Sequence, residues 1–181
     1  MSEIEKKSYD GVAKTLHWLI ALIAILMLIA GWGLEDLPLE EKKQIIMIHS
    51  GLGTTVFVLM LVRVVWRLTH KPPPPVPMPD WQHKISAVVH GSFYGLLLLQ
   101  PIFGVLQAAY IDYPVLAFGV IEYSALAVDN KDTYLLFHRL HGLSALLLIL
   151  LILVHAGAAL GRHFYLKDNV LRRMLPFAKI E

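Results

Sequence analysis

The 181-residue sequence contains no cysteine and few charged residues, and both shortages narrow what the protein can be. Without cysteine there are no disulfides, no thiolate-held iron–sulfur clusters and no covalent attachment of a c-type haem. Only 17% of the residues are charged and 56% are hydrophobic, a balance too apolar for an ordinary soluble domain. The formal net charge of +2 gives no support for a nucleic-acid partner. These limits indicate one integral membrane domain, residues 1–181, in contact with lipid.

Four long apolar stretches predict an all-α fold, a bundle of four transmembrane helices. A helix needs about 20 residues to cross the hydrocarbon core of a bilayer. The proline-rich segment 70–79 cannot be helical, and Pro101 is expected to bend the third helix. The longest connection, residues 110–134, could lie on the membrane surface or fold over a site. The predicted spans are residues 15–33, 44–68, 85–109 and 134–162.

Lysine and arginine are distributed unevenly between the two sides that this topology defines. Twelve lie on the side of the termini, with Lys6, Lys7 and Lys179 among them, and four lie on the opposite side. Because positive charge accumulates in cytoplasmic segments, both termini are predicted to be cytoplasmic. The outer side carries eight acidic residues against its four basic ones and is therefore net acidic.

Two of the three histidines in the fourth span, His141 and His155, lie fourteen residues apart, and the run from Leu146 to Val154 between them has no polar side chain. With a rise of about 1.5 Å per residue and about 3.6 residues per turn, they lie on nearly one face of the helix, about 21 Å apart. One is therefore near each surface of the membrane. A bare imidazole at that depth needs a partner, such as a metal, a haem iron or a hydrogen-bonding group.

Two further histidines pair with these when the topology assigns each a depth. His17 opens the first span, so it lies near the cytoplasmic side together with His155. His49 opens the second span, so it lies near the outer side together with His141. The pattern predicts two non-covalent b-type haems, whose axial iron ligands are His17 with His155 and His49 with His141. Two histidine ligands leave no vacant position on the iron, which suits electron transfer and disfavours oxygen binding.

Cations and small residues near these histidines are candidate haem contacts. Arg63, Arg67 or Arg139 could pair with the haem propionates. Small residues beside the outer pair would let a porphyrin approach the backbone, although they also help apolar helices to pack. They are Gly51, Gly53, Gly142 and Ala145.

Other histidines have competing interpretations. His90 is also intramembrane and near the cytoplasmic side, so it could replace His17 as a ligand or donate a hydrogen bond to a quinone. Lys14 and Arg63 are further quinone candidates, although a lipid headgroup would suit the same cations. His138 could form a metal site with His141, but no third ligand is nearby in the sequence. His70, His83 and His163 are expected to be solvated.

Several motifs between residues 9 and 177 resemble the bacterial cytochrome b561 family. They are His17-Trp18, Met47-Ile48-His49, Val62-Arg63, Trp66-Arg67-Leu68, the proline-rich segment, Ala117-Phe118-Gly119, His141 with His155, Lys167-Asp168-Asn169 and Leu171-Arg172-Arg173-Met174. The resemblance implies a small di-haem protein of the bacterial inner membrane that moves electrons to or from ubiquinone. It also implies that the four paired histidines are the haem ligands. One type of family member takes electrons from superoxide at a basic outer surface.

Three classes of function are open at this point. The first is an electron-transfer cytochrome that exchanges electrons with a quinone; superoxide is disfavoured as its donor because an acidic outer side repels an anion. The second is a membrane-anchor subunit that relays electrons for a larger redox enzyme through a partner protein, since the chain has no flavin or nucleotide motif. The third is a non-haem carrier of divalent metals, which the lack of acidic residues within the spans disfavours.

Overall fold

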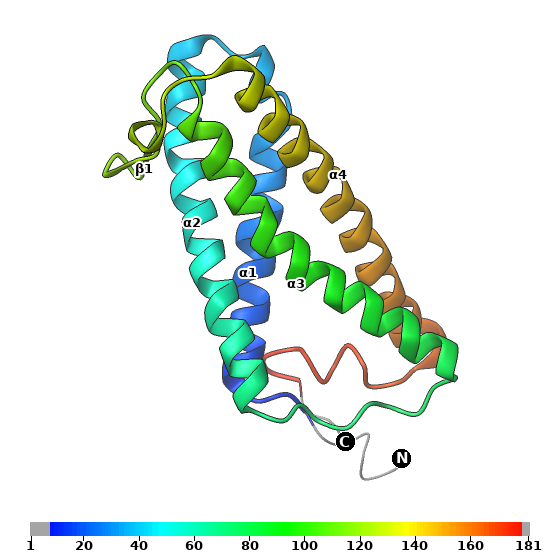
Figure 1. The fold of residues 1–181 in the computed structure, drawn as a ribbon. Helices are drawn as coiled ribbons and strands as arrows, with labels where there is room; N and C mark the ends of the chain where they lie inside the picture. The colour runs from blue at the N-terminus through cyan, green and yellow to red at the C-terminus, as the bar shows by residue number, and fades with distance from the viewer. Residues whose placement is uncertain (1–7, 179–181) are drawn as a thin grey trace.

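The computed structural model describes residues 8–178, and its four long helices form a single elongated bundle (Figure 1). The helices are α1 (Gly11–Gly31), α2 (Leu39–Thr69), α3 (Asp80–Ala109) and α4 (Lys131–Gly161). Short elements occupy the connections: η1 (Leu34–Asp36), β1 (Leu116–Ala117), β2 (Ile121–Glu122), η2 (Ser124–Leu126) and the π-helical turn η3 (Arg162–Leu166). The predicted all-α architecture is confirmed, and the two-residue strands are a small addition to it.

Each long helix is long and apolar enough to cross a membrane, so the chain is a multi-pass membrane protein. The helices begin a few residues before the predicted spans, because hydropathy marks only the apolar part of a helix. The side chains of Asp10 and Asn130 accept hydrogen bonds from the first-turn amides of Ala13 and Thr133, which starts α1 and α4 in polar sequence.

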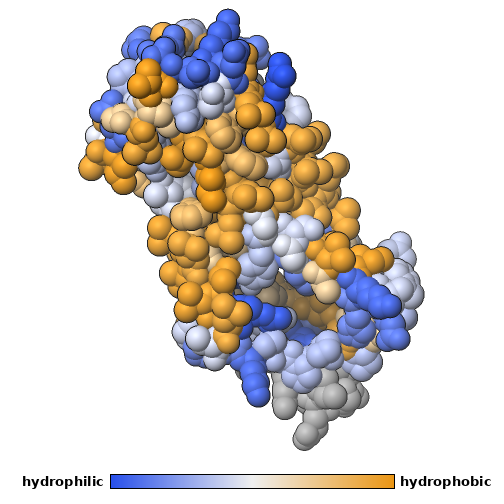
Figure 2. All heavy atoms as spheres, viewed as in Figure 1, coloured by the Kyte–Doolittle hydropathy of each residue, from blue (hydrophilic) through white to orange (hydrophobic). Residues whose placement is uncertain are grey.

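Large apolar side chains point outwards along the bundle. Figure 2 shows a broad hydrophobic zone between the more polar ends of the molecule. Ile29 is 66% exposed, Val65 60% and Leu153 64%. Water would solvate such a surface poorly, whereas lipid chains match it, so this zone is the lipid-facing surface.

Both described ends of the chain meet at one end of the bundle (Figure 1). The Tyr9 amide donates to the Arg173 carbonyl at 3.2 Å, and the Arg173 guanidinium donates to the Pro74 carbonyl at 2.7 Å. The Trp18 indole donates to the Met174 carbonyl at 2.9 Å. The tail therefore fastens the start of α1 to the proline-rich connector, which is non-helical as predicted.

We call this end, with residues 8–10, 70–79 and 167–178, the terminal end, and the opposite end, with residues 32–38 and 110–130, the hairpin end. Placing the two ends of the chain together agrees with the predicted topology. Which side of the membrane they face stays a prediction. Lys6, Lys7 and Lys179, which contribute to that prediction, lie outside the described residues.

The long connection folds back over α2 at the hairpin end, which was one of the two predicted alternatives. β1 and β2 pair antiparallel through a turn in which Phe118 and Gly119 have φ values of 51° and 73°. A bulky residue rarely adopts this left-handed conformation, so other contacts must hold it. The Phe118 amide donates to the Met47 carbonyl at 3.1 Å, and its ring lies against Gly51, where any side chain would overlap it.

Candidate functional site

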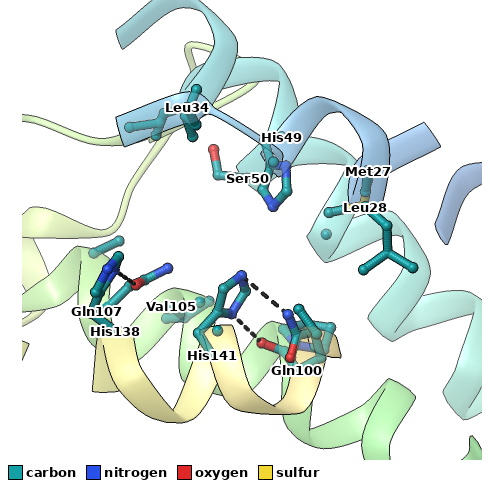
Figure 3. A pocket seen from close by; sticks show the side chains of 18 of the residues that line it. Met27, Leu28, Leu34, His49, Ser50, Gln100, Val105, Gln107, His138 and His141 are labelled. Carbon is teal, nitrogen blue, oxygen red and sulfur yellow. Dashed lines mark hydrogen bonds between the residues drawn. The ribbon is translucent and has the colours of Figure 1, made fainter. Parts of the chain in front are cut away.

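A cavity of 380 Å³ lies between the four helices at the hairpin end (Figure 3). Its volume is within the range of about 300–1,000 Å³ that small-molecule and cofactor sites occupy. All four helices and the long connection contribute to its mostly apolar wall. The lining includes Met27, Leu28, His49, Gly53, Gln100, Gly104, Val115, Tyr123, His138 and His141.

His49 and His141 face each other across this cavity (Figure 3), with ring centroids 6.2 Å apart and ring planes inclined by 64°. A metal held at about 2.0 Å from one nitrogen of each ring would set the centroids about 6.3 Å apart. His49 Nδ1 is buried and has no hydrogen-bond partner within residues 8–178. A buried polar nitrogen without a partner is costly, so the pair fits a haem iron bound between the two rings.

Gln100 on α3 orients His141 through two hydrogen bonds (Figure 3). His141 Nδ1 donates to the Gln100 carbonyl at 3.1 Å, and the Gln100 side-chain amide donates to His141 Nε2 at 3.2 Å. The Ser144 hydroxyl donates to the Gln100 side-chain oxygen. A ligating histidine usually donates its other ring N–H to an acceptor such as this carbonyl. Nε2 is then the nitrogen that could bind a metal, which would take the place of the Gln100 amide there. Sequence reasoning missed this role, although an amide inside an apolar span was a signal for it.

The small residues predicted around the outer pair have mixed outcomes. Gly53, Gly142 and Ala145 line the cavity. The prediction for Gly51 was wrong, because Gly51 packs against the Phe118 ring. Two glycines that were not singled out lie nearer the imidazoles. A Cβ on Gly104 would lie 3.3 Å from His141 Cε1, and one on Gly31 would lie 3.8 Å from His49 Cε1.

Polar groups at the cavity rim differ from those predicted. Lys42 lines the cavity, whereas Arg139 is exposed on α4. His138 Nδ1 lies 3.2 Å from Gln107 Oε1, and its ring stacks on Tyr134.

Within residues 8–178, no group of three histidine, aspartate or glutamate side chains is arranged to hold a metal ion by itself. This finding does not favour the divalent-metal carrier.

The second predicted pair, His17 and His155, comes together at the terminal end. Its ring centroids are also 6.2 Å apart, with the planes inclined by 65°. The spacing again fits an iron between two imidazoles. Arg63 lies beside this pair, with its guanidinium 3.5 Å from His17 Nδ1, 3.3 Å from the Ala13 carbonyl and over the Tyr94 ring. Figure 2 shows the molecule hollowed at this end.

His90 lies beside His155 at the terminal end. Its ring centroid is 5.4 Å from that of His155, which is closer than an iron between two imidazoles requires. The geometry therefore favours His17 over His90 as the partner of His155. Ser86 lies 3.2 Å from His90 Nδ1, and the imidazole is exposed. Arg67 is exposed in the last turn of α2.

The remaining candidates lie around this end of the bundle. Lys14 is half-buried on the first turns of α1. His70 is exposed and stacks on the Trp66 ring, and His83 is half-buried. His163 was expected to be solvated, and it is half-buried. Its Nδ1 is buried where η3 and the following tail come together, and this atom has no partner in the described part of the chain.

Comparison with known proteins gives matches along almost the whole chain. A family described as prokaryotic cytochrome b561 matches residues 8–177. Cytochrome b561 homolog 1 of Escherichia coli K12 is 32% identical over 173 residues, which cover 91% of this chain and 94% of that protein. The probable superoxide oxidase CybB of Yersinia pestis is 32% identical over 177 residues, with 94% and 97% covered. Cytochrome b561 homolog 2 of E. coli K12 is 28% identical over 170 residues, with 92% and 90% covered.

Proposed function

We propose that this chain, which belongs to the prokaryotic cytochrome b561 family, holds one b-type haem at each end of its bundle and carries electrons between the two membrane surfaces. Family membership confirms the resemblance found in the sequence and makes the chain a membrane electron-transfer protein with b-type haem. One observation carries the finer proposal. Two histidine pairs, one at each end, have the same separation of 6.2 Å between ring centroids.

In this proposal His49 and His141 are the axial ligands at the hairpin end, and His17 and His155 are those at the terminal end. A bound haem iron supplies a one-electron carrier. At each site the two histidines would both bind the iron, which would leave no position for oxygen. The Gln100 carbonyl accepts the Nδ1 proton of His141 at 3.1 Å, which fixes the tautomer that presents Nε2.

We place the exchange of electrons with a quinone, such as ubiquinone, at the terminal end. The proposed contacts are His90, Arg63 and Lys14. His90 is exposed, so it is available as a hydrogen-bond partner for a quinone oxygen. Arg63 lies beside His17 and Arg67 lies in the last turn of α2 at the same end, and cations there would stabilise the negative charge that a quinone acquires on reduction.

Quinol oxidation by the purified, haem-loaded protein tests this assignment. Under anaerobic conditions, ubiquinol or menaquinol should reduce the haems of the wild type. His90→Leu should slow this reduction at least tenfold, by loss of one hydrogen bond to the quinone. His83→Leu, another histidine near the start of α3, is the matched control and should leave the rate unchanged. If neither quinol reduces haems that other donors reduce at the same potential, the quinone assignment is wrong.

Superoxide is a second candidate electron donor, because one relative with 32% identity is named a probable superoxide oxidase. The hairpin end argues against it. Its side of the membrane carries eight acidic residues against four basic ones, and a negative surface slows the approach of an anion. We therefore expect superoxide to reduce the haems slowly, and added salt to speed the reaction by screening. Rapid reduction that salt slows would contradict this expectation.

We also propose that both termini face the cytoplasm, with the chain in the bacterial inner membrane. The twelve lysines and arginines on the side of the termini, against four on the other, support this orientation. A reporter enzyme that is active only in the cytoplasm, fused after Glu181, should be active. If only a reporter that works in the periplasm is active at this position, the termini face the periplasm and the two ends of the bundle exchange sides.

A further inference from the structure

A second cavity, of 270 Å³, lies at the terminal end outside both histidine pairs. It forms where α4 passes through the π-helical turn η3 into the tail. Lys167 ends this turn with a φ of 54°, and this reversal starts the tail segment that closes the cavity. The lining consists of His163, Phe164, Lys167, Asp168 and Arg172.

The charge of this cavity is positive, because its one acidic residue is already engaged. The Asp168 carboxylate lies 2.6 Å from the Arg162 guanidinium and accepts the Val170 amide at 3.0 Å. Arg162 is held in turn by Gln82 on α3, at 2.9 Å. Within residues 8–178, neither Lys167 nor Arg172 pairs with an acidic side chain.

His163 adds a buried nitrogen to the same wall. Its Nδ1 has no hydrogen-bond partner among the residues described, and leaving such an atom unpaired costs free energy. Nδ1 has almost no exposed surface, so a ligand oxygen in the cavity would satisfy it only if the imidazole turned towards the cavity. Lysine, arginine and an imidazole N–H are three donors, and together they suit a group with several negatively charged oxygens.

The surface next to the cavity is apolar and aromatic. Phe164 is 67% exposed, Tyr165 89% and Leu166 62%, immediately after a helix that is long enough to span the membrane. Aromatic side chains at such a position lie at the level of the lipid headgroups. A ligand that combines an anionic group with an apolar part would match both surfaces.

We propose that this cavity binds the phosphate group of an anionic phospholipid. Lys167 and Arg172 contact the phosphate oxygens, the His163 imidazole donates to one of them, and the acyl chains lie along Phe164 and the end of α4. A choline headgroup brings its own cation close to Lys167 and Arg172, so a zwitterionic lipid binds less well. Inorganic phosphate has the same oxygen chemistry but makes no contact with the aromatic surface.

Native mass spectrometry of the haem-loaded protein tests the proposal, with equimolar dioleoylphosphatidylglycerol and dioleoylphosphatidylcholine as probes. The wild type should retain the anionic lipid at least tenfold more often than the zwitterionic one. Lys167→Asn with Arg172→Gln should abolish that preference; asparagine tolerates the left-handed conformation at position 167. Lys71→Gln with Lys84→Gln removes the same charge from exposed positions at the same end and should keep the preference.

The other outcomes overturn the proposal. Equal loss in both double variants would mean that the lipid senses only the general charge of the terminal end. Full displacement of the lipid by millimolar inorganic phosphate would identify a site for soluble anions. No preference in the wild type would leave the cavity without this ligand. The haem absorbance of each variant reports its folding, and Lys167→Asn alone, which should lower the preference severalfold, keeps the test decisive if the double variant does not fold.

Discussion

The two histidine pairs are nearly the same in geometry and differ in what surrounds them. Both have ring centroids 6.2 Å apart, with inclinations of 64° at the hairpin end and 65° at the terminal end. At the hairpin end the neighbours of His141 are a neutral amide and a hydroxyl, from Gln100 and Ser144. The long connection closes that site, with Val115 and Tyr123 in the wall of the cavity.

At the terminal end the neighbours are a guanidinium and a third imidazole, from Arg63 and His90, and the molecule is hollowed (Figure 2). A haem loses one positive charge on reduction, so a nearby cation favours its reduced state. We therefore expect the terminal-end haem to have the higher reduction potential. If both pairs hold haem as proposed, the same two ligands make both sites electron carriers, and their surroundings set the direction in which electrons move.

Removal of one ligand at a time should separate the two sites and has the largest expected effect. His141→Ala should lose the haem of the hairpin end and His155→Ala that of the terminal end, so each should retain about half of the haem absorbance. His83→Ala is the control and should retain all of it. The measurement is haem absorbance per protein after purification. Loss of both haems from either variant would mean that the sites do not fold independently.

The closure of the hairpin end can be broken at Gly51. Gly51→Ala places a methyl group into the Phe118 ring, and overpacking of this kind costs about 1–3 kcal/mol. The hairpin-end haem should be lost at a lower temperature than in the wild type, as followed by its absorbance. Gly91→Ala is the matched control, because nothing lies within 4 Å of the added methyl group. Equal behaviour of the two variants would show that the Phe118 contact does not close the site.

The electrostatic difference between the sites should depend on Arg63. Arg63→Gln should lower the potential of the terminal-end haem, on the order of tens of millivolts, because it removes a nearby positive charge. The hairpin-end potential should stay the same in a spectroscopic redox titration. Arg139→Gln removes an exposed charge from α4 and serves as the control. Equal shifts of both haems would assign the effect to the net charge of the protein.

Gln100 should matter only at the hairpin end, and to a smaller extent. Gln100→Leu removes the side-chain N–H that points at His141, so the positive end of an amide dipole is lost beside the haem and its potential should fall, on the order of ten millivolts. The electron paramagnetic resonance signal of the same haem should shift as the imidazole reorients. Gln107→Leu removes a cavity amide that contacts His138 and should leave both properties unchanged. A shift at the terminal-end haem would contradict the assignment.

The smallest effect concerns how the terminal end is fastened. Burial raises the pKa of the Asp10 carboxyl, but hydrogen bonds from the Ala13 amide and the Trp66 indole outweigh it and hold the pKa below its ordinary value of 3.8. The pKa of Asp10 is lower in the folded protein than in the unfolded one. These bonds therefore stabilise the fold at pH values above 3.8, and the stabilisation is lost as the pH falls through the pKa of the folded protein. Solvent screens this exposed group, so Asp10→Asn should cost only about 0.3 kcal/mol at pH 7. Thermal unfolding of both proteins should converge towards pH 2; a constant difference would assign the effect to helix capping.

The sequence was sufficient for the pairing of the histidines and insufficient for what surrounds them. Helical rise and the alternation of spans assign His17 and His155 to one depth, and His49 and His141 to the other, because both rules are local or topological. The contact of Phe118 with Gly51 joins residues far apart in the chain through a left-handed turn, and no local rule predicts it. The burial of the His163 Nδ1 atom likewise depends on how the tail folds.

The central claim is that each end of the bundle holds one haem, and the haem content of the purified wild type tests it most directly. A pyridine haemochrome spectrum, referred to an independent protein concentration, counts the b-type haems in each chain. The account predicts two. A value of one, from preparations supplied with excess haem, would contradict it, since one of the two equally spaced histidine pairs would then have no iron to bind.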